Sequence, residues 1–289
     1  MCFQTIQAQP VDTTSFSEEI TLDEFIVRAI DDGFNVGNFI NKIKADTTFY
    51  KAFKNMRLKS YNAENLIECF DKKGKIKASL ESETKQIFRD GCRSMNVLEE
   101  NTTGDFYDKK GDYNYFTAQM YASLFFTKQK VCAGDKEVKS GGRIDKSKEQ
   151  LKQLMFNPGS NISGIPFMSN KVGIFEPEVA KMYDFSLTVE QKNGVETYKF
   201  SAIPKADFRK KVVINKFVTW FRPSDLSIIA RDYSLSYNAM GYDFDVDMYV
   251  ILNQIGQDLL PAYISYKGNW KVITKDRERV NFRANFSYL

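Results

Sequence analysis

Alternating apolar and polar residues fill the C-terminal part of the chain, from Val212 to Leu289, and this pattern constrains the fold most strongly. In the last stretch, RVNFRANFSYL, every second residue from Val280 to Tyr288 is apolar. Because successive side chains of a strand point to opposite faces, the pattern predicts strands with one buried and one solvated face. Five such stretches follow one another with short turn signals between them, and sequential strands of this kind usually pair. This part is therefore predicted to be an antiparallel sheet.

Helical periodicity marks the N-terminal part and the middle of the chain. Apolar residues recur three or four positions apart in 21–33, 36–45, 46–56 and 146–156, which favours helices there. Residues 117–129 fit either a helix or a strand, whereas 57–70, 75–88 and 94–107 have the shorter period of strands. The predicted fold class is α+β: a large, curved, mostly antiparallel sheet, or half-open barrel, with N-terminal and mid-chain helices packed on it.

Two near-identical pentapeptides, 70–74 and 107–111, lie between the strand-like segments. In each of them an aspartate is followed by two lysines and a glycine. Asp71 and Asp108 start the turns, and Gly74 and Gly111 supply the positive φ that the closing position needs. Both pentapeptides are therefore predicted to be tight turns with solvated tips.

The first residues resemble the end of a secretory signal peptide, because Ile6-Gln7-Ala8 precede Gln9 in the pattern of a cleavage site. We expect residues 1–8 to be a signal-peptide remnant, 9–20 a flexible segment and 21–289 a single α+β domain. Two alternatives are an accidental likeness and a lipoprotein anchor at Cys2. Export to the periplasm of a Gram-negative bacterium is the expected localisation. No apolar run reaches the ~18 residues that a membrane-spanning helix needs.

Three cysteines lie beyond Cys2. Cys92 and Cys132 both fall at expected element ends, and we predict a disulfide between them that closes a loop of about 40 residues. Cys69 alternates with Ile67 in a strand-like segment, so it is expected to be a small buried apolar residue. The alternative is that all three are reduced thiols in the core.

The absence of histidine excludes several common kinds of catalysis. Without it the chain has no Ser-His-Asp or Cys-His arrangement, no His-ligated zinc and no imidazole base. The net charge of +4 is spread over 289 residues, which gives little attraction for nucleic acid. We therefore predict a protein that is not an enzyme, with no catalytic residue, no metal, no cofactor and no nucleic-acid partner.

Asp243, Asp245 and Asp247 alternate along one predicted strand and imitate the start of an EF-hand loop. The sixth and twelfth loop positions hold Met248 and Gln254, where calcium binding needs Gly and Glu. A carboxylate pair for glycoside hydrolysis is a further alternative. We expect the three carboxylates to lie on a solvated face and to form cross-strand ion pairs. The candidate partners are Arg231, Lys267, Arg279 and Arg283.

The chain is rich in aromatic residues, with 24 Phe and 15 Tyr. Aromatic side chains favour pleated, half-buried surfaces and also line apolar ligand cavities. We expect the apolar face of the C-terminal strands to line a cavity for an apolar or amphipathic ligand. The expected lining residues are Trp220, Phe244, Val246, Met248, Ile264, Tyr266, Phe282 and Phe286. The alternative is that they form a dry core.

Four C-terminal segments carry a family resemblance: Trp-Phe-Arg-Pro-Ser at 220–224, Ile-Ile-Ala-Arg-Asp-Tyr at 228–233, GYDFDVDMYV and LLPAYISYKGNW. They resemble the outer-membrane lipoprotein carrier (LolA-like) family, in which a Trp-to-Pro turn and a later strand introduced by Leu-Pro recur. The match covers mainly Val195 to Leu289. An exported Bacteroidetes-type protein of unknown role on a similar scaffold is the second resemblance.

The resemblance implies a periplasmic half-open barrel that holds acyl chains in an apolar concavity. Lipid or a lipidated protein would be its partner, with peripheral association to the envelope and no transmembrane segment. The alternative is a structural or interaction protein of the cell envelope whose sheet is only a scaffold.

Overall fold

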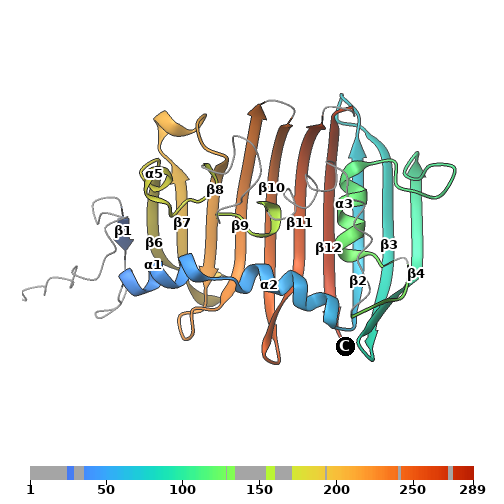
Figure 1. The fold of residues 1–289 in the computed structure, drawn as a ribbon, viewed down its shortest axis with the longest axis horizontal. Coiled ribbons are helices and arrows are strands. Elements are labelled where there is room, and N and C mark those ends of the chain that lie inside the picture. Colours follow the sequence, from blue (N-terminus) through green and yellow to red (C-terminus); the bar gives the residue numbers. More distant parts are fainter. Residues whose placement is uncertain are drawn as a thin grey trace, which may run out of the picture.

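The structure is a computed structural model, which describes residues 25–28, 36–127, 129–133, 154–159, 171–192, 194–239, 242–272 and 276–289. Their strands form one 12-stranded sheet in the order β1-β6-β7-β8-β9-β10-β11-β12-β2-β3-β4-β5 (Figure 1). The strands are β1 (Phe25–Arg28), β2 (Tyr61–Phe70), β3 (Ile76–Arg89), β4 (Cys92–Gly104), β5 (Val131–Cys132), β6 (Tyr183–Lys192), β7 (Val195–Pro204), β8 (Ile214–Phe221), β9 (Ile228–Ala239), β10 (Tyr242–Ile255), β11 (Asp258–Val272) and β12 (Glu278–Tyr288).

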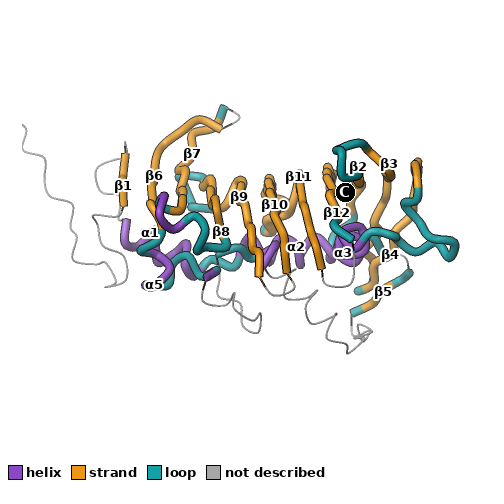
Figure 2. The backbone as a smooth tube through the Cα atoms, turned by 90° about the horizontal axis from the view of Figure 1, so that it is seen from above, coloured by secondary structure: helices purple, strands orange, loops and turns teal. Residues whose placement is uncertain are grey.

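The sheet is open and almost wholly antiparallel, since only the pairing of β1 with β6 is parallel among the described strands. Helices cover one of its faces (Figure 2). They are α1 (Val36–Ala45), α2 (Thr48–Asn55), α3 (Phe116–Phe125) and α5 (Pro177–Ala180), with 3-10 turns η2 (Met56–Leu58) and η4 (Ala206–Phe208). The predicted class, a large mostly antiparallel sheet with N-terminal and mid-chain helices on it, is confirmed.

The last strand lies in the interior of the sheet, between β11 and β2. Its pairing with β2 runs from Arg279 opposite Phe70 to Tyr288 opposite Tyr61. The amide of Leu289 also donates to the carbonyl of Ser60 at 3.0 Å. The C-terminal meander therefore continues directly into the N-terminal strands, and both halves of the chain share one sheet.

The helix α3 resolves the ambiguous segment at 117–129. Its first turn is capped from a distant strand, because the Glu278 carboxylate of β12 accepts the amides of Phe116 at 2.7 Å and Thr117 at 3.0 Å. A carboxylate at this end satisfies free N–H groups and interacts favourably with the helix dipole. The fully buried Tyr121 then faces the sheet. Tertiary contacts thus select the helix at this position.

The predicted helix over 21–33 is wrong where the chain is described. Phe25–Arg28 is a strand instead, with Phe25 opposite Phe185 of β6. The local Phe-Ile-Val run suits a strand, and pairing with a sheet edge outweighs a weak helical preference. The predicted helices at 36–45 and 46–56 are confirmed by α1 and α2. Of the predicted helix at 146–156, only 154–156 is described, and it is helical.

The N-terminal predictions, a signal remnant at 1–8 and a flexible segment at 9–20, lie outside the described residues. Within the described ranges, none of the helices is both long enough and apolar enough to cross a membrane.

Candidate functional site

Seven of the eight residues expected to line a cavity lie in one packed core on the helix-covered face. The ring of Tyr121 in α3 stacks on Phe282 with centroids 4.4 Å apart, and Phe125 follows at 5.7 Å. Four cavities in the described part of the chain have none of the seven in their walls. The seven are Phe244, Val246, Met248, Ile264, Tyr266, Phe282 and Phe286. Here the chain's own helix occupies the aromatic face, as the dry-core alternative expects.

The close packing of this face is visible at Gly268 in β11. The side chain of Tyr266 folds along its own strand, so that a Cβ at Gly268 would lie 1.9 Å from the Tyr266 hydroxyl oxygen. Trp270 donates its indole N–H to the same hydroxyl group. Burial raises the pKa of Tyr266 above its ordinary value. The glycine therefore makes room for an aromatic ring of the protein itself.

Trp220, the eighth expected residue, lies on the opposite face, and its placement with the others was wrong. It belongs to a small cluster with Val218 and Ala230. Its indole N–H donates to the Glu190 carboxylate, and the Lys192 ammonium lies 3.6 Å from its ring centroid. β8 is apolar on both faces, so alternation alone does not say which face turns toward the helices.

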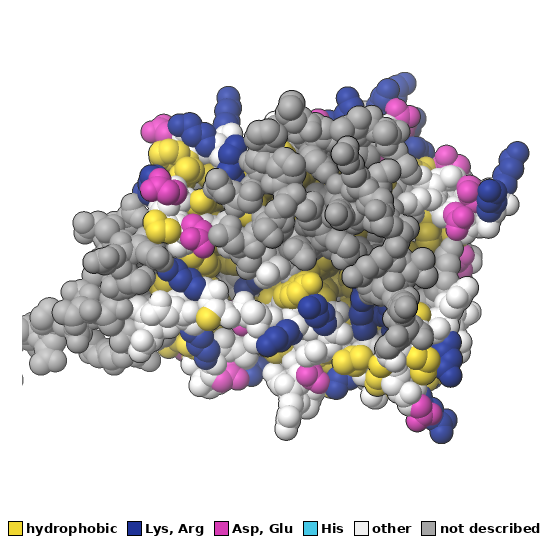
Figure 3. Space-filling model, viewed as in Figure 1, with side chains coloured by type: hydrophobic (Ala, Val, Ile, Leu, Met, Phe, Trp, Pro, Cys, Tyr) yellow, Lys and Arg dark blue, Asp and Glu magenta, His cyan; other side chains and the backbone are white. Residues whose placement is uncertain are grey.

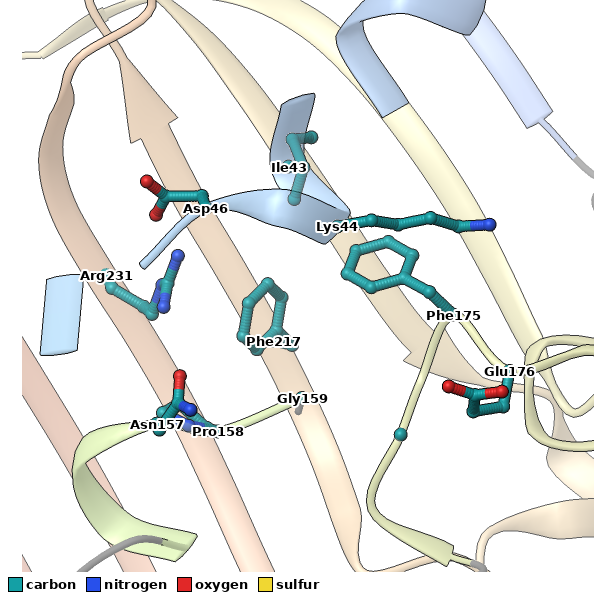
Figure 4. Close-up of a pocket in the computed structure, with 11 residues that line it drawn as sticks. Ile43, Lys44, Asp46, Asn157, Pro158, Gly159, Phe175, Glu176, Phe217 and Arg231 are labelled. Carbon is teal, nitrogen blue, oxygen red and sulfur yellow. The ribbon is translucent and has the colours of Figure 1, made fainter. Parts of the chain in front are cut away.

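The first cavity, which we call the Arg231 cavity, lies between α1, β8 and β9 and has a volume of about 190 Å³. Figure 4 shows Asp46 and Arg231 at one end of it, with Phe217 beside them. Its walls come from five separate parts of the chain. They are formed by Ile43, Lys44, Asp46, Asn157, Pro158, Gly159, Gly173, Phe175, Glu176, Phe217 and Arg231.

Arg231 lies under α2 and is only 5% exposed. Its Nε donates to the Thr219 hydroxyl at 3.0 Å, and its guanidinium carbon lies 4.2 Å and 4.8 Å from the ring centroids of Phe49 and Phe217. Burial lowers its pKa to about 10, while the charge of Asp46 acts in the opposite direction. The group therefore remains protonated at neutral pH.

The expected ion pair between Arg231 and the Asp243 to Asp247 carboxylates is wrong. Arg231 lies opposite Val250 in the pairing of β9 with β10, on the helix-covered face, whereas the carboxylates point to the other face. A charged residue in phase with the apolar Tyr233 and Leu235 was the sequence signal for this burial.

The three carboxylates have other neighbours. Asp243 pairs with Arg277, and Asp247 accepts a hydrogen bond from Ser234. Desolvation and then the charge of Asp247 raise the pKa of Asp245. Within the described ranges, no group of His, Cys, Asp or Glu side chains is placed to hold a metal ion.

On the face seen in Figure 3, basic and acidic side chains are intermixed over the described surface.

The second cavity, which we call the β3–β4 cavity, lies on the helix-covered face near the β4 end of the sheet and has a volume of about 370 Å³. Its wall includes Val97, an apolar residue that is 57% exposed. Tyr107 donates to Glu100 at 3.1 Å and lies 5.2 Å, centroid to centroid, from Tyr113. The lining residues are Leu80, Ser82, Thr84, Met95, Val97, Glu100, Tyr107, Gly111, Tyr113, Phe126 and Thr127.

Cys92 and Cys132 form a disulfide between β4 and β5, where they lie directly opposite each other. The bridge spans 40 residues of sequence. Cys69 is a free, buried thiol, and burial raises its pKa to about 12. A thiol of this kind is inert and behaves as a small apolar side chain.

No family model matches the sequence, and no curated protein matches it either. Among solved structures, the chain is similar to a DUF1329 family protein from Desulfovibrio piger, with 9% identity, coverage of 83% of this chain and 88% of that one, and a TM-score of 0.25. It is also similar to a putative outer membrane lipoprotein-sorting protein domain from Vibrio parahaemolyticus, with 11% identity, coverage of 81% and 88%, and a TM-score of 0.26.

A third similar structure is lipovitellin, solved in a study of lipid-protein interactions, with 9% identity and a TM-score of 0.26. The match covers 80% of this chain but 25% of lipovitellin.

Proposed function

We propose that this protein is an exported, non-catalytic carrier or binding protein for an amphipathic ligand, such as a fatty acid or an acyl chain of a lipid or lipidated protein. The β3–β4 cavity is its binding site. The observation that supports the proposal is an apolar wall left open to solvent beside polar groups on the same surface.

The apolar wall suits an acyl chain. Leu80, Met95, Val97 and Phe126 all border the cavity. Each methylene group that leaves water contributes about 0.8 kcal/mol to binding. At about 370 Å³, the cavity falls within the usual range of ~300–1,000 Å³ for small-molecule sites. It therefore accommodates part of an acyl chain, with the remainder extending along the open end of the sheet.

The polar groups of the cavity suit the head of such a ligand. Ser82 and Thr84 are buried on β3, where the Asn65 amide donates to the Thr84 hydroxyl at 3.3 Å. Tyr107 and Glu100 stand at the exposed side. The hydroxyl groups in this arrangement orient a ligand through a few hydrogen bonds, as in most small-molecule sites.

Export to the periplasm is supported by the Cys92–Cys132 disulfide. Disulfides form and persist in oxidising compartments, and they are rare in reducing ones. The bridge also ties β5 to β4, the strand that supplies Met95 and Val97 to the cavity.

The test is a titration of the full chain with a dansyl-labelled C11 fatty acid, followed by fluorescence. The informative variant is Val97→Trp, which fills the cavity. Its matched control is Leu98→Trp, because Leu98 is the next residue of the same strand, is 58% exposed and does not line the cavity. Native mass spectrometry of the protein purified from a bacterial periplasm gives an independent readout.

We expect the wild type and Leu98→Trp to bind the probe equally, and Val97→Trp to bind it at least about tenfold more weakly. Lipid should co-purify with the wild type. A wild type that neither binds the probe nor carries lipid contradicts the proposal, as do two variants that lose binding equally. Either result favours the alternative, an envelope protein whose sheet is a scaffold.

A further inference from the structure

The Arg231 guanidinium carries hydrogen-bond donors that no described residue uses. Its Nε is bonded to Thr219, whereas its two terminal nitrogens have no hydrogen-bond partner among the described residues. The rings of Phe49 and Phe217 fix the plane of the group from its sides. A buried charge is costly unless hydrogen-bonded groups compensate it, so the free side of this guanidinium calls for an acceptor.

Asp46 has an unused hydrogen-bond acceptor that complements these donors. One carboxylate oxygen accepts the amide and the hydroxyl of Thr48. The other, Oδ2, is buried and has no hydrogen-bond partner within the described part of the chain. Asp46 and Arg231 border the same cavity without forming an ion pair with each other (Figure 4). One end of the cavity therefore offers unused donors and an unused acceptor side by side.

The size and walls of the cavity limit its occupant. A volume of about 190 Å³ corresponds to roughly six water molecules at ~30 Å³ each, which fits a ligand of similar atom count and excludes a long acyl chain. Ile43, Phe175 and Phe217 give part of the wall an apolar character. The occupant is therefore small, charged at one end and compatible with an apolar group at the other.

We propose that the Arg231 cavity binds a small zwitterion of the α-amino acid class. Its carboxylate accepts hydrogen bonds from the two terminal nitrogens of Arg231, and its ammonium group donates to Oδ2 of Asp46. A guanidinium fork matches a carboxylate in geometry and can bind it bidentately. The side chain of the amino acid extends toward Phe175 and Phe217.

The pair of opposite charges explains why a zwitterion is preferred over a simple ion. An anion alone meets the attraction of Arg231 but also the repulsion of Asp46. A cation alone is attracted by Asp46 but repelled by Arg231. A ligand with both charges satisfies both groups at once and leaves neither buried polar group unpaired.

The experiment is isothermal titration calorimetry of the full chain with each of the twenty free α-amino acids. Propionate and ethylamine serve as single-charge probes. Arg231→Met removes the fork while keeping an apolar side chain, and Asp46→Asn keeps an oxygen for the Thr48 hydrogen bonds. Arg283→Met, on the exposed face of β12, is the matched control.

We expect at least one amino acid to bind, Arg231→Met to bind it at least about a hundredfold more weakly, and Arg283→Met to bind it as the wild type does. If Arg231→Met fails to fold, Asp46→Asn decides. It should weaken amino-acid binding at least about tenfold and leave propionate binding equal or stronger.

The absence of binding by every amino acid up to about 10 mM, well above the usual range of weak sites, would overturn the proposal and leave a water-filled cavity. Equal affinity for an amino acid and for propionate would also overturn it. The fatty-acid probe of the β3–β4 cavity is measured separately, so each proposal can fail without the other.

Discussion

Two regions of the same helix-covered face differ in how they use their apolar side chains. Across β11 and β12 the aromatic face is covered by Tyr121 and Phe125 of α3. Near the β4 end the face carries smaller and more polar residues, Leu80, Ser82 and Thr84, and a cavity remains there. The region richest in aromatic residues is thus the packed one.

The difference shows that a sheet face rich in aromatic side chains tends to be covered by a helix of the same chain. Burying rings against rings adds favourable aromatic contacts to the hydrophobic gain, so an aromatic sheet face is an efficient place to dock a helix. A face of small and hydroxyl-bearing side chains gains less from such docking. On this part of the sheet, space for a ligand therefore remains beside Ser82 and Thr84 and not beside the rings of β11 and β12.

The largest expected effect comes from Phe282→Ala, which tests the packed region directly. The ring is fully buried and stacks on Tyr121. We expect the free energy of unfolding to fall by about 3–5 kcal/mol, because the cavity it leaves is only partly refilled. Val97→Ala at the β3–β4 cavity should change it by no more than about 0.5 kcal/mol. Urea unfolding measures both, and similar losses in the two variants would erase the contrast between the regions.

Removing the disulfide examines the open end of the sheet. We expect the double substitution Cys92→Ala and Cys132→Ala to lower the free energy of unfolding by about 2–4 kcal/mol, because the bridge restrains a long loop of the unfolded chain. Thermal unfolding of the variant, beside wild type with and without reductant, measures this loss. Two free thiols found by mass mapping under non-reducing conditions would contradict the bridge itself.

Gly268→Ala sharpens the account of the packed region. The added Cβ would displace Tyr266 from its place over the glycine. We expect a loss of about 1–3 kcal/mol in the free energy of unfolding from overpacking. Ser265→Ala, on the other face of β11, is the control and should stay within about 0.5 kcal/mol of wild type. Chemical unfolding of both variants is the measurement, and a Gly268→Ala protein as stable as the control would mean that the face is loosely packed.

The smallest expected effect is the pH dependence of stability that Glu190 causes; this residue lies beside Trp220 on the face of the sheet opposite the helices. Burial acts to raise its pKa, but hydrogen bonds from Trp220 and Lys199 outweigh it, so the pKa lies below the ordinary 4.5. A lowered pKa gives stability that is present above about pH 4.5 and is lost as pH falls through the folded-state value.

As pH falls, we therefore expect the free energy of unfolding of Glu190→Gln to decrease less than that of the wild type. The difference should be below about 1 kcal/mol, since the ion pair with Lys199 is partly exposed. The free energy of unfolding, measured from pH 7 downward for wild type and variant, decides the point. Parallel pH profiles for the two proteins would remove Glu190 as the titrating group.

Much of the fold followed from local chemistry. The turn at Asp71 forms as predicted, with its carboxylate accepting the amides of Lys73 at 2.8 Å and Lys75 at 2.9 Å and with Gly74 at φ 79°. The second pentapeptide repeats the arrangement at Asp108 and Gly111. Interactions within five residues decide such turns, so the sequence suffices to predict them.

The candidate sites followed less well, because they depend on distant segments. Alternation placed Phe244 and Phe282 on one face but could not tell that α3 would cover Phe282 or that Phe244 would stack on Trp270. Alternation also grouped Trp220 with the residues of the helix-covered face, although it lies on the opposite face. It placed Arg231 on the solvated face, although Arg231 is buried under the helices. No local rule reveals that Asp46 and Arg231, on different elements, share a cavity.

The sequence by itself determined most of the strands, their turns and, where only one face of a strand is apolar, which face is buried, because these depend on side chains a few residues apart. The strand β1 and the two-sided strand β8 are the exceptions. The tertiary structure decided that β12 pairs with β2, that α3 fills the aromatic face, and that Arg231 is buried beside Asp46. These outcomes arise from competition among distant segments for the same surfaces. The physical reason is that several apolar faces could pack together equally well locally, and only packing between distant segments decides which of them meet. Cavities for ligands remain where those segments do not fill the space between them.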